Sequence, residues 1–153
     1  MKDDLICWDS SVLISWLRGD EDADRNRATR AVVQHVESGT SRLVVSTLLY
    51  VEVLESRMPA GAIEQFKKFM QNRRMIEIIA VDIRVAEKAQ AIRNISSRNL
   101  KTPDAVHIAT AILSGAKLFH TFDEGLLRLG GTDDVDGLSI TACEIPGMNL
   151  PLF

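Results

Sequence analysis

Four acidic side chains are the residues of this chain best suited to do chemistry together. They are Asp9, Glu52, Asp104 and Asp123. Asp9 directly follows the apolar run Leu5–Trp8, and Asp123 comes just after another short run, Leu118–Thr121. Glu52 and Asp104 lie near the starts of segments with helical periodicity. Because sites in parallel α/β sheets gather at the carboxyl ends of strands, we expect the four carboxylates to meet at one edge of a sheet.

Carboxylates gathered in this way repel one another. Two unit charges 4 Å apart repel by ~4 kcal/mol at an effective dielectric constant of about 20. Such a cluster persists when some members are protonated or when a divalent cation lies among them. Oxygen ligands without His or Cys favour Mg²⁺ or Mn²⁺. An ion of this kind suits phosphodiester hydrolysis, because it can activate a water molecule and stabilise the leaving oxygen.

Each acid also has a structural explanation when it is taken alone. Asp9 could cap the helix that follows it, Asp104 could complement a helix dipole, and Asp123 could belong to a turn. Glu52 is harder to explain, because its apolar neighbours on all sides predict a buried helix in which a carboxylate needs a partner. Arg57, five positions further on, has a poor spacing for pairing. The coincidence of all four acids is what favours a site.

The elements that would position the acids follow from the hydrophobic pattern. Strands are predicted over 5–8, 42–46, 76–79, 118–121 and 138–143. Helices are predicted over a first segment that ends at Gly19 and over 25–37, 47–57, 61–72, 82–95 and 103–114. Ser46 and Thr102 are the expected N-caps of two of these helices, with Pro103 at the first helical position. This order predicts an α/β fold with a mainly parallel sheet covered by helices on both faces.

Length and composition are those of one globular domain. The chain has 153 residues, of which 46% are hydrophobic and 25% charged. We predict a domain over 1–145 and a short C-terminal tail over 146–153. The net charge of −3 excludes a uniformly basic nucleic-acid binder, but not an enzyme that cuts nucleic acid through bound cations.

The sequence also predicts a cytoplasmic protein. No apolar run approaches the ~18 residues of a membrane span. The N-terminal apolar run is too short for a secretory signal and has acidic flanks. Cys7 and Cys143 lie far apart in apolar runs without a CxxC pattern, which predicts two buried, reduced thiols and no zinc site.

Four segments of the chain resemble PIN-domain ribonucleases, most closely the toxin subunits of VapBC-type toxin–antitoxin pairs. The segments are WDSSVLI (8–14), STLLYVEV (46–53), TPDAVHIATA (102–111) and TFD (121–123). They occur in the order found in that family and cover the chain from about Leu5 to Leu129. Where a bulky aromatic residue often follows the last acid, this chain has Leu126 and Leu127, a departure expected to alter packing beneath the site.

The resemblance implies a role for each acid. Asp9, Glu52, Asp104 and Asp123 take the places of the family's metal-binding acids, which are also its catalytic residues. Ser10 and Thr121 take the hydroxyl positions beside the first and the last acid. The resemblance further implies a single PIN-like domain with a five-stranded parallel sheet, Mg²⁺ or Mn²⁺ as cofactor, and endonucleolytic cleavage of RNA. It also implies a homodimer and a cognate antitoxin that inserts a segment near the site.

Three further residues could assist the acids. His107 lies one helical turn after Asp104, so it either donates to a carboxylate or is a packed helix histidine. Arg98 and Lys101 approach the helix start that bears Asp104, where they either contact RNA phosphates or are ordinary solvated charges.

The leading interpretation is therefore a metal-dependent endoribonuclease. One alternative is a non-catalytic RNA-binding module that keeps an acidic pocket. Another is a metal-dependent phosphohydrolase of a different substrate class, although the DxD nucleophile pattern of one such class is absent at Asp9-Ser10-Ser11. The chain has neither a P-loop nor a GxGxxG pattern, which disfavours the corresponding nucleotide-binding enzymes.

Overall fold

A single parallel sheet forms the centre of the molecule. The computed structural model describes residues 4–19, 22–96 and 99–145. The strands are β1 (Asp4–Trp8), β2 (Ser41–Ser46), β3 (Ile76–Ile79), β4 (Leu118–His120) and β5 (Ser139–Thr141). Their spatial order is β3-β2-β1-β4-β5, and every neighbouring pair is parallel. The predicted α/β fold with five parallel strands is confirmed.

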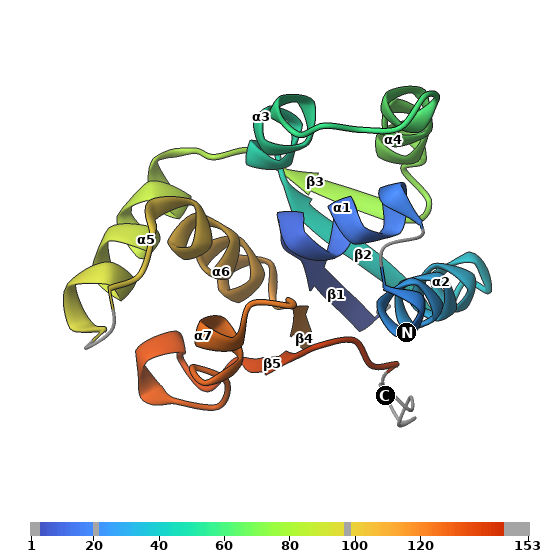
Figure 1. Cartoon of the computed structure of the whole chain (residues 1–153). Coiled ribbons are helices and arrows are strands. Elements are labelled where there is room, and N and C mark those ends of the chain that lie inside the picture. The colour runs from blue at the N-terminus through green and yellow to red at the C-terminus, as the bar shows by residue number, and fades with distance from the viewer. Residues whose placement is uncertain (1–3, 20–21, 97–98, 146–153) are drawn as a thin grey trace.

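Helices cover both faces of the sheet (Figure 1). One layer contains α1 (Ser10–Arg18), α2 (Ala23–Glu37), α3 (Leu48–Glu55) and α4 (Ala62–Gln71). The other contains α5 (Ile83–Ile95), α6 (Thr102–Ser114) and α7 (Glu124–Leu127). Alternate residues of β1 pack into the two layers: Ile6 and Trp8 lie in the first, and Leu5 and Cys7 lie in the second. The α7 helix and a 3₁₀ turn at Asp133–Val135 were not predicted, since both are shorter than the periodicity can reveal.

Some predicted helix ends are wrong by one or two residues. Lys101, not Thr102, holds the N-cap position of α6. Pro103 still lies in the first turn, where N–H groups have no partner within the helix, so its lack of an N–H costs no hydrogen bond. Thr47, not Ser46, holds the N-cap position of α3, although the Ser46 hydroxyl accepts from the Leu48 amide (3.1 Å). The second helix begins at Ala23, because the Asp22 carboxylate accepts from two first-turn amides.

The expectation of a buried α3 is wrong. Leu49 and Val53 are buried, but Val51 and Leu54 are each about half exposed. A helix with apolar residues all round normally lies inside a protein. Here the eight-residue helix packs against α1 and α6, and Tyr50 contacts the Phe66 ring of α4, while the face with Val51 and Leu54 stays open.

Polar groups inside the core are paired or kept neutral. The Trp8 indole donates to Nδ1 of His120 (3.0 Å), and the Glu144 amide points at Nε2 of the same ring (3.0 Å). Burial lowers the pKa of His120 to about 3, so the imidazole is neutral and accepts from one of these two donors only. Cys7 and Cys143 are buried free thiols whose pKa values burial raises, as predicted.

The predicted division of the chain into a domain, 1–145, and a tail stays untested. The predicted tail, 146–153, lies outside the described residues. Within the ranges that the structure describes, no helix is both long and apolar enough to cross a membrane.

Candidate active site

Asp9 connects the central strand to the first helix. Its extended backbone ends β1, and its Oδ1 atom caps α1 by accepting from the Val12 amide (3.1 Å). The same oxygen accepts from the Ser11 hydroxyl (2.7 Å), and Oδ2 accepts from the Thr121 hydroxyl (2.6 Å). Only 3% of the residue is exposed. Asp9 is therefore the helix cap that the structural explanation predicts. The same side chain is also a buried carboxylate at the carboxyl end of a strand, where a cation could bind.

Thr121 and Ser11 tie the segment after β4 to Asp9. The Thr121 hydroxyl donates to Asp9 and accepts from the Asp123 amide (3.0 Å). The Ser11 hydroxyl likewise donates to Asp9 and accepts from the Phe122 amide (3.1 Å). Asp123 in turn caps α7 by accepting from the Leu126 amide (3.1 Å). The first and the last acid are thus held in one hydrogen-bonded frame.

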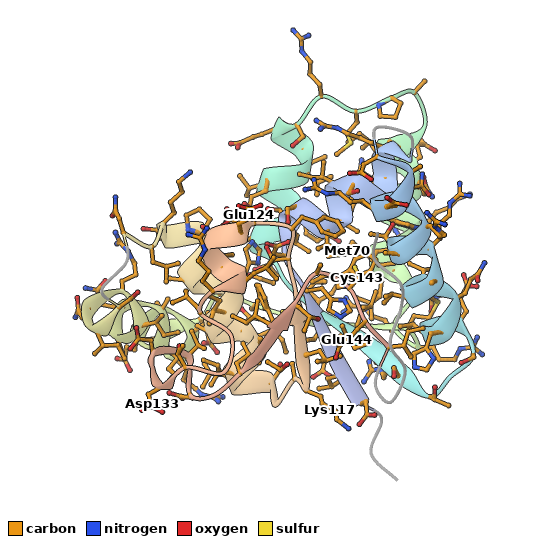
Figure 2. The ribbon with its side chains drawn as sticks, turned by 60° about the horizontal axis from the view of Figure 1, so that its bottom comes forward. Met70, Lys117, Glu124, Asp133, Cys143 and Glu144 are labelled. Carbon is orange, nitrogen blue, oxygen red and sulfur yellow. The ribbon has the colours of Figure 1, made fainter. Side chains whose placement is uncertain are left out.

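The end of the molecule that carries this frame can be followed in Figure 2. Glu124, the residue after Asp123, lies well above Lys117, which precedes β4 and is near the bottom of the view. The acids that follow β1 and β4 are therefore at the carboxyl end of the sheet, the place where parallel α/β folds bind ligands.

Glu52 has a partner that lies far away in the sequence. Its Oε1 atom is 2.5 Å from Nε2 of His107 on α6, and its Oε2 atom accepts from the Ser10 hydroxyl (3.1 Å). His107 is only 1% exposed, whereas 23% of the Glu52 side chain is exposed. Burial opposes ionisation of Glu52, but the hydrogen bond and charge of His107, with the Ser10 hydroxyl, bring its pKa below the ordinary value. His107 is thus both a packed helix histidine and a carboxylate partner.

Asp104 lies in the first turn of α6 and is coupled electrostatically to the frame. Burial raises its pKa, and the nearby charges of Asp123 and Asp9 raise it further. The charges of His107 and Lys101 act in the opposite direction without cancelling this rise. Lys101 is therefore near enough to act on Asp104, while Arg98 lies outside the described residues. Three acids from separate segments consequently share one electrostatic environment.

Burial also raises the pKa of Asp9. Hydrogen bonds from Thr121 and Ser11, the charge of His107 and the Val12 amide oppose that rise but do not overcome it. Two carboxylates that resist ionisation lie in the same region, a condition that a bound cation would relieve.

The donor set fits a hard divalent cation, although its side chains are not yet arranged around one. Carboxylate oxygens with no thiolate beside them are ligands that Mg²⁺ and Mn²⁺ prefer. Within residues 4–19, 22–96 and 99–145, no three His, Cys, Asp or Glu side chains are placed to hold a metal ion as they stand. Glu52 is turned to His107 and Ser10. Binding would therefore require side-chain rotation or bridging water.

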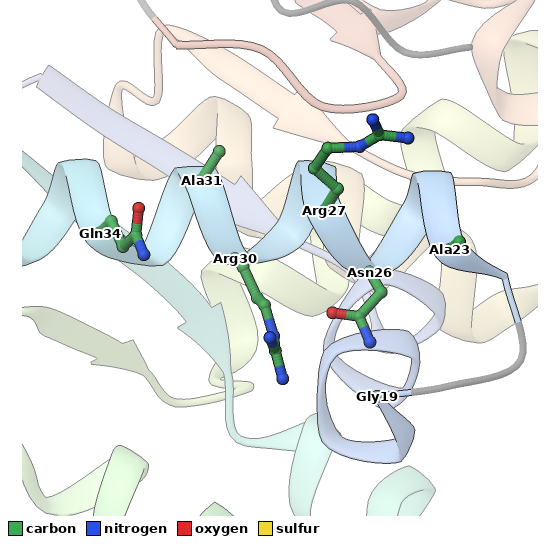
Figure 3. Close-up of a pocket in the computed structure, with 7 residues that line it drawn as sticks. All are labelled: Gly19, Ala23, Asn26, Arg27, Arg30, Ala31 and Gln34. Atoms are coloured by element: carbon green, nitrogen blue, oxygen red, sulfur yellow. The ribbon is translucent and has the colours of Figure 1, made fainter.

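A cavity of about 520 Å³ lies elsewhere, along α2 (Figure 3). Its lining includes Gly19 at the end of α1 and the α2 residues Asn26, Arg30 and Gln34. None of the four acids lines it. The cavity is therefore separate from the acidic site, which we call the acidic rim because its acids lie at the carboxyl end of the sheet.

Known structures share this architecture. The chain is similar to a chain of VapBC2 from Rickettsia felis bound to a promoter DNA fragment (11% identity, TM-score 0.67, 92% of this chain and 99% of that chain covered). It is also similar to FitAcB from Neisseria gonorrhoeae (16% identity, TM-score 0.61, 88% and 95% covered). A toxin–antitoxin complex from Klebsiella pneumoniae contains another similar chain (22% identity, TM-score 0.57, 92% and 99% covered). At these identities the likeness establishes the fold.

The sequence itself carries the family assignment. No curated protein matches it significantly over its length. The family model for the PIN domain, however, matches residues 6–131, which include all four acids and the elements that carry them. The chain therefore belongs to the PIN domain family, as the resemblance of its four segments predicted.

Proposed function

We propose that this protein is a Mg²⁺- or Mn²⁺-dependent endoribonuclease that hydrolyses RNA phosphodiesters, and that it is the toxin of a toxin–antitoxin pair. The observation that carries the proposal is the hydrogen-bonded frame in which Thr121 joins Asp9 and the Asp123 amide at the carboxyl end of a parallel sheet, with Asp104 near enough to be affected by both charges. Membership of the PIN domain family supports a nuclease.

Each residue has a part in the proposed reaction. Asp9, Glu52, Asp104 and Asp123 would hold the cation, which when bound supplies activation of water and stabilisation of the leaving oxygen. Thr121 fixes Asp9 relative to Asp123, and Ser10 and His107 hold Glu52 as an anion. Lys101 and, from its place in the sequence before α6, Arg98 would contact RNA phosphates near Asp104.

The proposed partners follow from the structural neighbours. One chain of similar fold comes from a toxin–antitoxin complex, and two others come from VapBC assemblies bound to DNA. We infer that this chain, too, has a cognate antitoxin that covers the acidic rim. A homodimer and a cytoplasmic location belong to the same proposal.

The decisive experiment compares the purified protein with its Asp104→Asn variant on a pool of total RNA. We expect cleavage with Mg²⁺ or Mn²⁺ and none with EDTA. The cleavage rate of the variant should fall by more than ~10–100-fold, which is the cost of removing a residue that only supports a metal ligand. Its far-ultraviolet circular dichroism should remain that of a folded chain. Asp82→Asn, at an acid distant in the sequence that caps α5, is the matched control and should cleave normally.

The alternatives predict other results. A non-catalytic RNA-binding module would bind RNA in a mobility-shift assay without turnover at any metal concentration. A phosphohydrolase of small esters would release phosphate from p-nitrophenyl phosphate and leave RNA intact. Full activity of Asp104→Asn would exclude the proposed mechanism.

A further inference from the structure

Arg25 reaches the acidic rim from a helix that carries none of the four acids. It lies in the first turn of α2, and its guanidinium carbon is 4.7 Å from the centre of the Phe122 ring. Phe122 stands between Thr121 and Asp123, and its amide donates to Ser11, the partner of Asp9. The Phe122 backbone is therefore part of the frame that holds two acids, and Arg25 rests on the ring of that residue.

Two contacts orient the guanidinium without using its hydrogen bonds. A cation stacked on an aromatic face is held in position, and Nε lies 3.7 Å from Oδ2 of Asp22. Among the described residues, the Arg25 side chain makes no hydrogen bond, and its buried Nε atom has no such partner. A guanidinium offers five N–H donors in a fixed plane, so the donors of Arg25 are unused although its position is fixed.

A guanidinium with unpaired N–H donors beside the proposed nuclease site is suited to bind a phosphate group of RNA. Planar N–H donors match the oxygens of a phosphate group, and stacking on an aromatic ring presents their edge outward. The side chain keeps 43% of its surface exposed, so a strand of RNA could approach it. The nearby Asp22 and Asp24 disfavour a purely electrostatic patch, which makes one oriented contact the better description.

We propose that Arg25 is a substrate-binding residue that contacts a phosphate of the RNA strand next to the one being cleaved, with Phe122 as the positioning residue that supports it. This inference rests on the proposed function, because it assigns a further contact to the same site. It adds α2 to the proposed RNA-binding surface, beside Lys101 at the start of α6.

The test measures binding and cleavage of a fluorescein-labelled single-stranded RNA that the wild-type protein cuts. Binding is followed by anisotropy in Ca²⁺ over a range of KCl concentrations. Arg25→Gln should weaken binding about fivefold or more and reduce the salt slope by about one. The KM should rise while kcat changes little. Arg30→Gln, an exposed arginine on the same helix that lines the α2 cavity, is the matched control and should leave affinity and slope unchanged.

Two further variants separate RNA contact from helix stability. Asp22→Asn keeps the N-cap acceptor, since Asn caps helices as well as Asp, but removes the charge facing Arg25. It should tighten RNA binding about twofold or more, because a full unit of positive charge is then available to phosphate. Phe122→Leu should reproduce part of the Arg25→Gln loss and add little to it in the double variant, because both changes remove one oriented contact.

The results distinguish this inference from the proposed function. A wild-type protein that neither binds nor cuts RNA in any metal overturns both. A wild-type protein that cuts RNA, together with an Arg25→Gln variant of unchanged affinity, salt slope and KM, overturns the role of Arg25 alone. A fall in kcat with unchanged KM and salt slope overturns it as well, because a phosphate contact must appear in binding.

Discussion

The Thr121 hydroxyl joins two of the acids by itself. It donates to Oδ2 of Asp9 and accepts from the Asp123 amide, at a position that is fully buried. In Thr121→Val the volume is conserved, but a buried carboxylate loses a donor and the Asp123 amide, in a partly buried hydrogen bond, loses its acceptor. We expect a loss of about 1–3 kcal/mol in the free energy of unfolding and a lower cleavage rate, measured by urea denaturation and by RNA cleavage.

Two comparisons isolate that effect. Thr121→Ser keeps the hydroxyl and should recover most of both losses. Thr110→Val removes another buried threonine hydroxyl, which only donates to the Val106 carbonyl within α6, so it should cost less stability and leave cleavage intact. Equal losses of stability and of cleavage rate in the two valine variants would show that Thr121 contributes no more than any other buried threonine.

At the scale of the element, the same residue type performs two tasks. Asp9, Asp22, Asp82 and Asp123 all cap helices through their side chains. Asparagine keeps the cap but removes the charge. We therefore expect Asp123→Asn to change unfolding by only about 0.5 kcal/mol yet abolish cleavage, while Asp123→Ala loses about 1 kcal/mol as well.

Asp82 supplies the contrast for that prediction. Asp82→Asn should preserve both stability and cleavage, and Asp82→Ala should lose about 1 kcal/mol of stability with cleavage unchanged. Urea denaturation and the RNA assay measure both quantities in all four variants. If the Asp123→Asn variant still cleaves RNA, Asp123 is only a helix cap and the prediction is wrong.

This double use explains what the sequence could and could not predict. The strands and most helices follow from local periodicity, and the resemblance placed all four acids in the family's order. Local pattern cannot tell a capping aspartate from a metal ligand, because both stand at the same place after a strand. It also could not pair Glu52 with His107, which lie 55 positions apart and meet only when α3 packs against α6. The exposure of α3 depends on the same tertiary packing.

At the scale of the whole molecule, the proposed cation site would couple folding to cation binding. Residues as distant as Asp9 and Thr121, 112 positions apart, meet only in the folded chain. A cation held there binds the native state and not the unfolded chain, so it must raise the melting temperature. Because a proton and a cation compete for the same carboxylates, the gain must also depend on pH.

The sign of that pH dependence follows from the two raised pKa values. Burial raises the pKa of Asp9, and burial with the charges of Asp123 and Asp9 raises that of Asp104. Lowering the pH toward these values protonates the folded carboxylates, so the cation must displace protons and binds more weakly. We expect the rise in melting temperature caused by 5 mM Mn²⁺ (about 2–4 °C for each kcal/mol of stabilisation at this length) to be larger at pH 7.5 than at pH 5.5, measured by differential scanning fluorimetry against EDTA. Asp104→Asn should shrink both the rise and its pH dependence, whereas Asp82→Asn should keep them. An equal rise at both pH values would mean that Mn²⁺ binds away from these carboxylates.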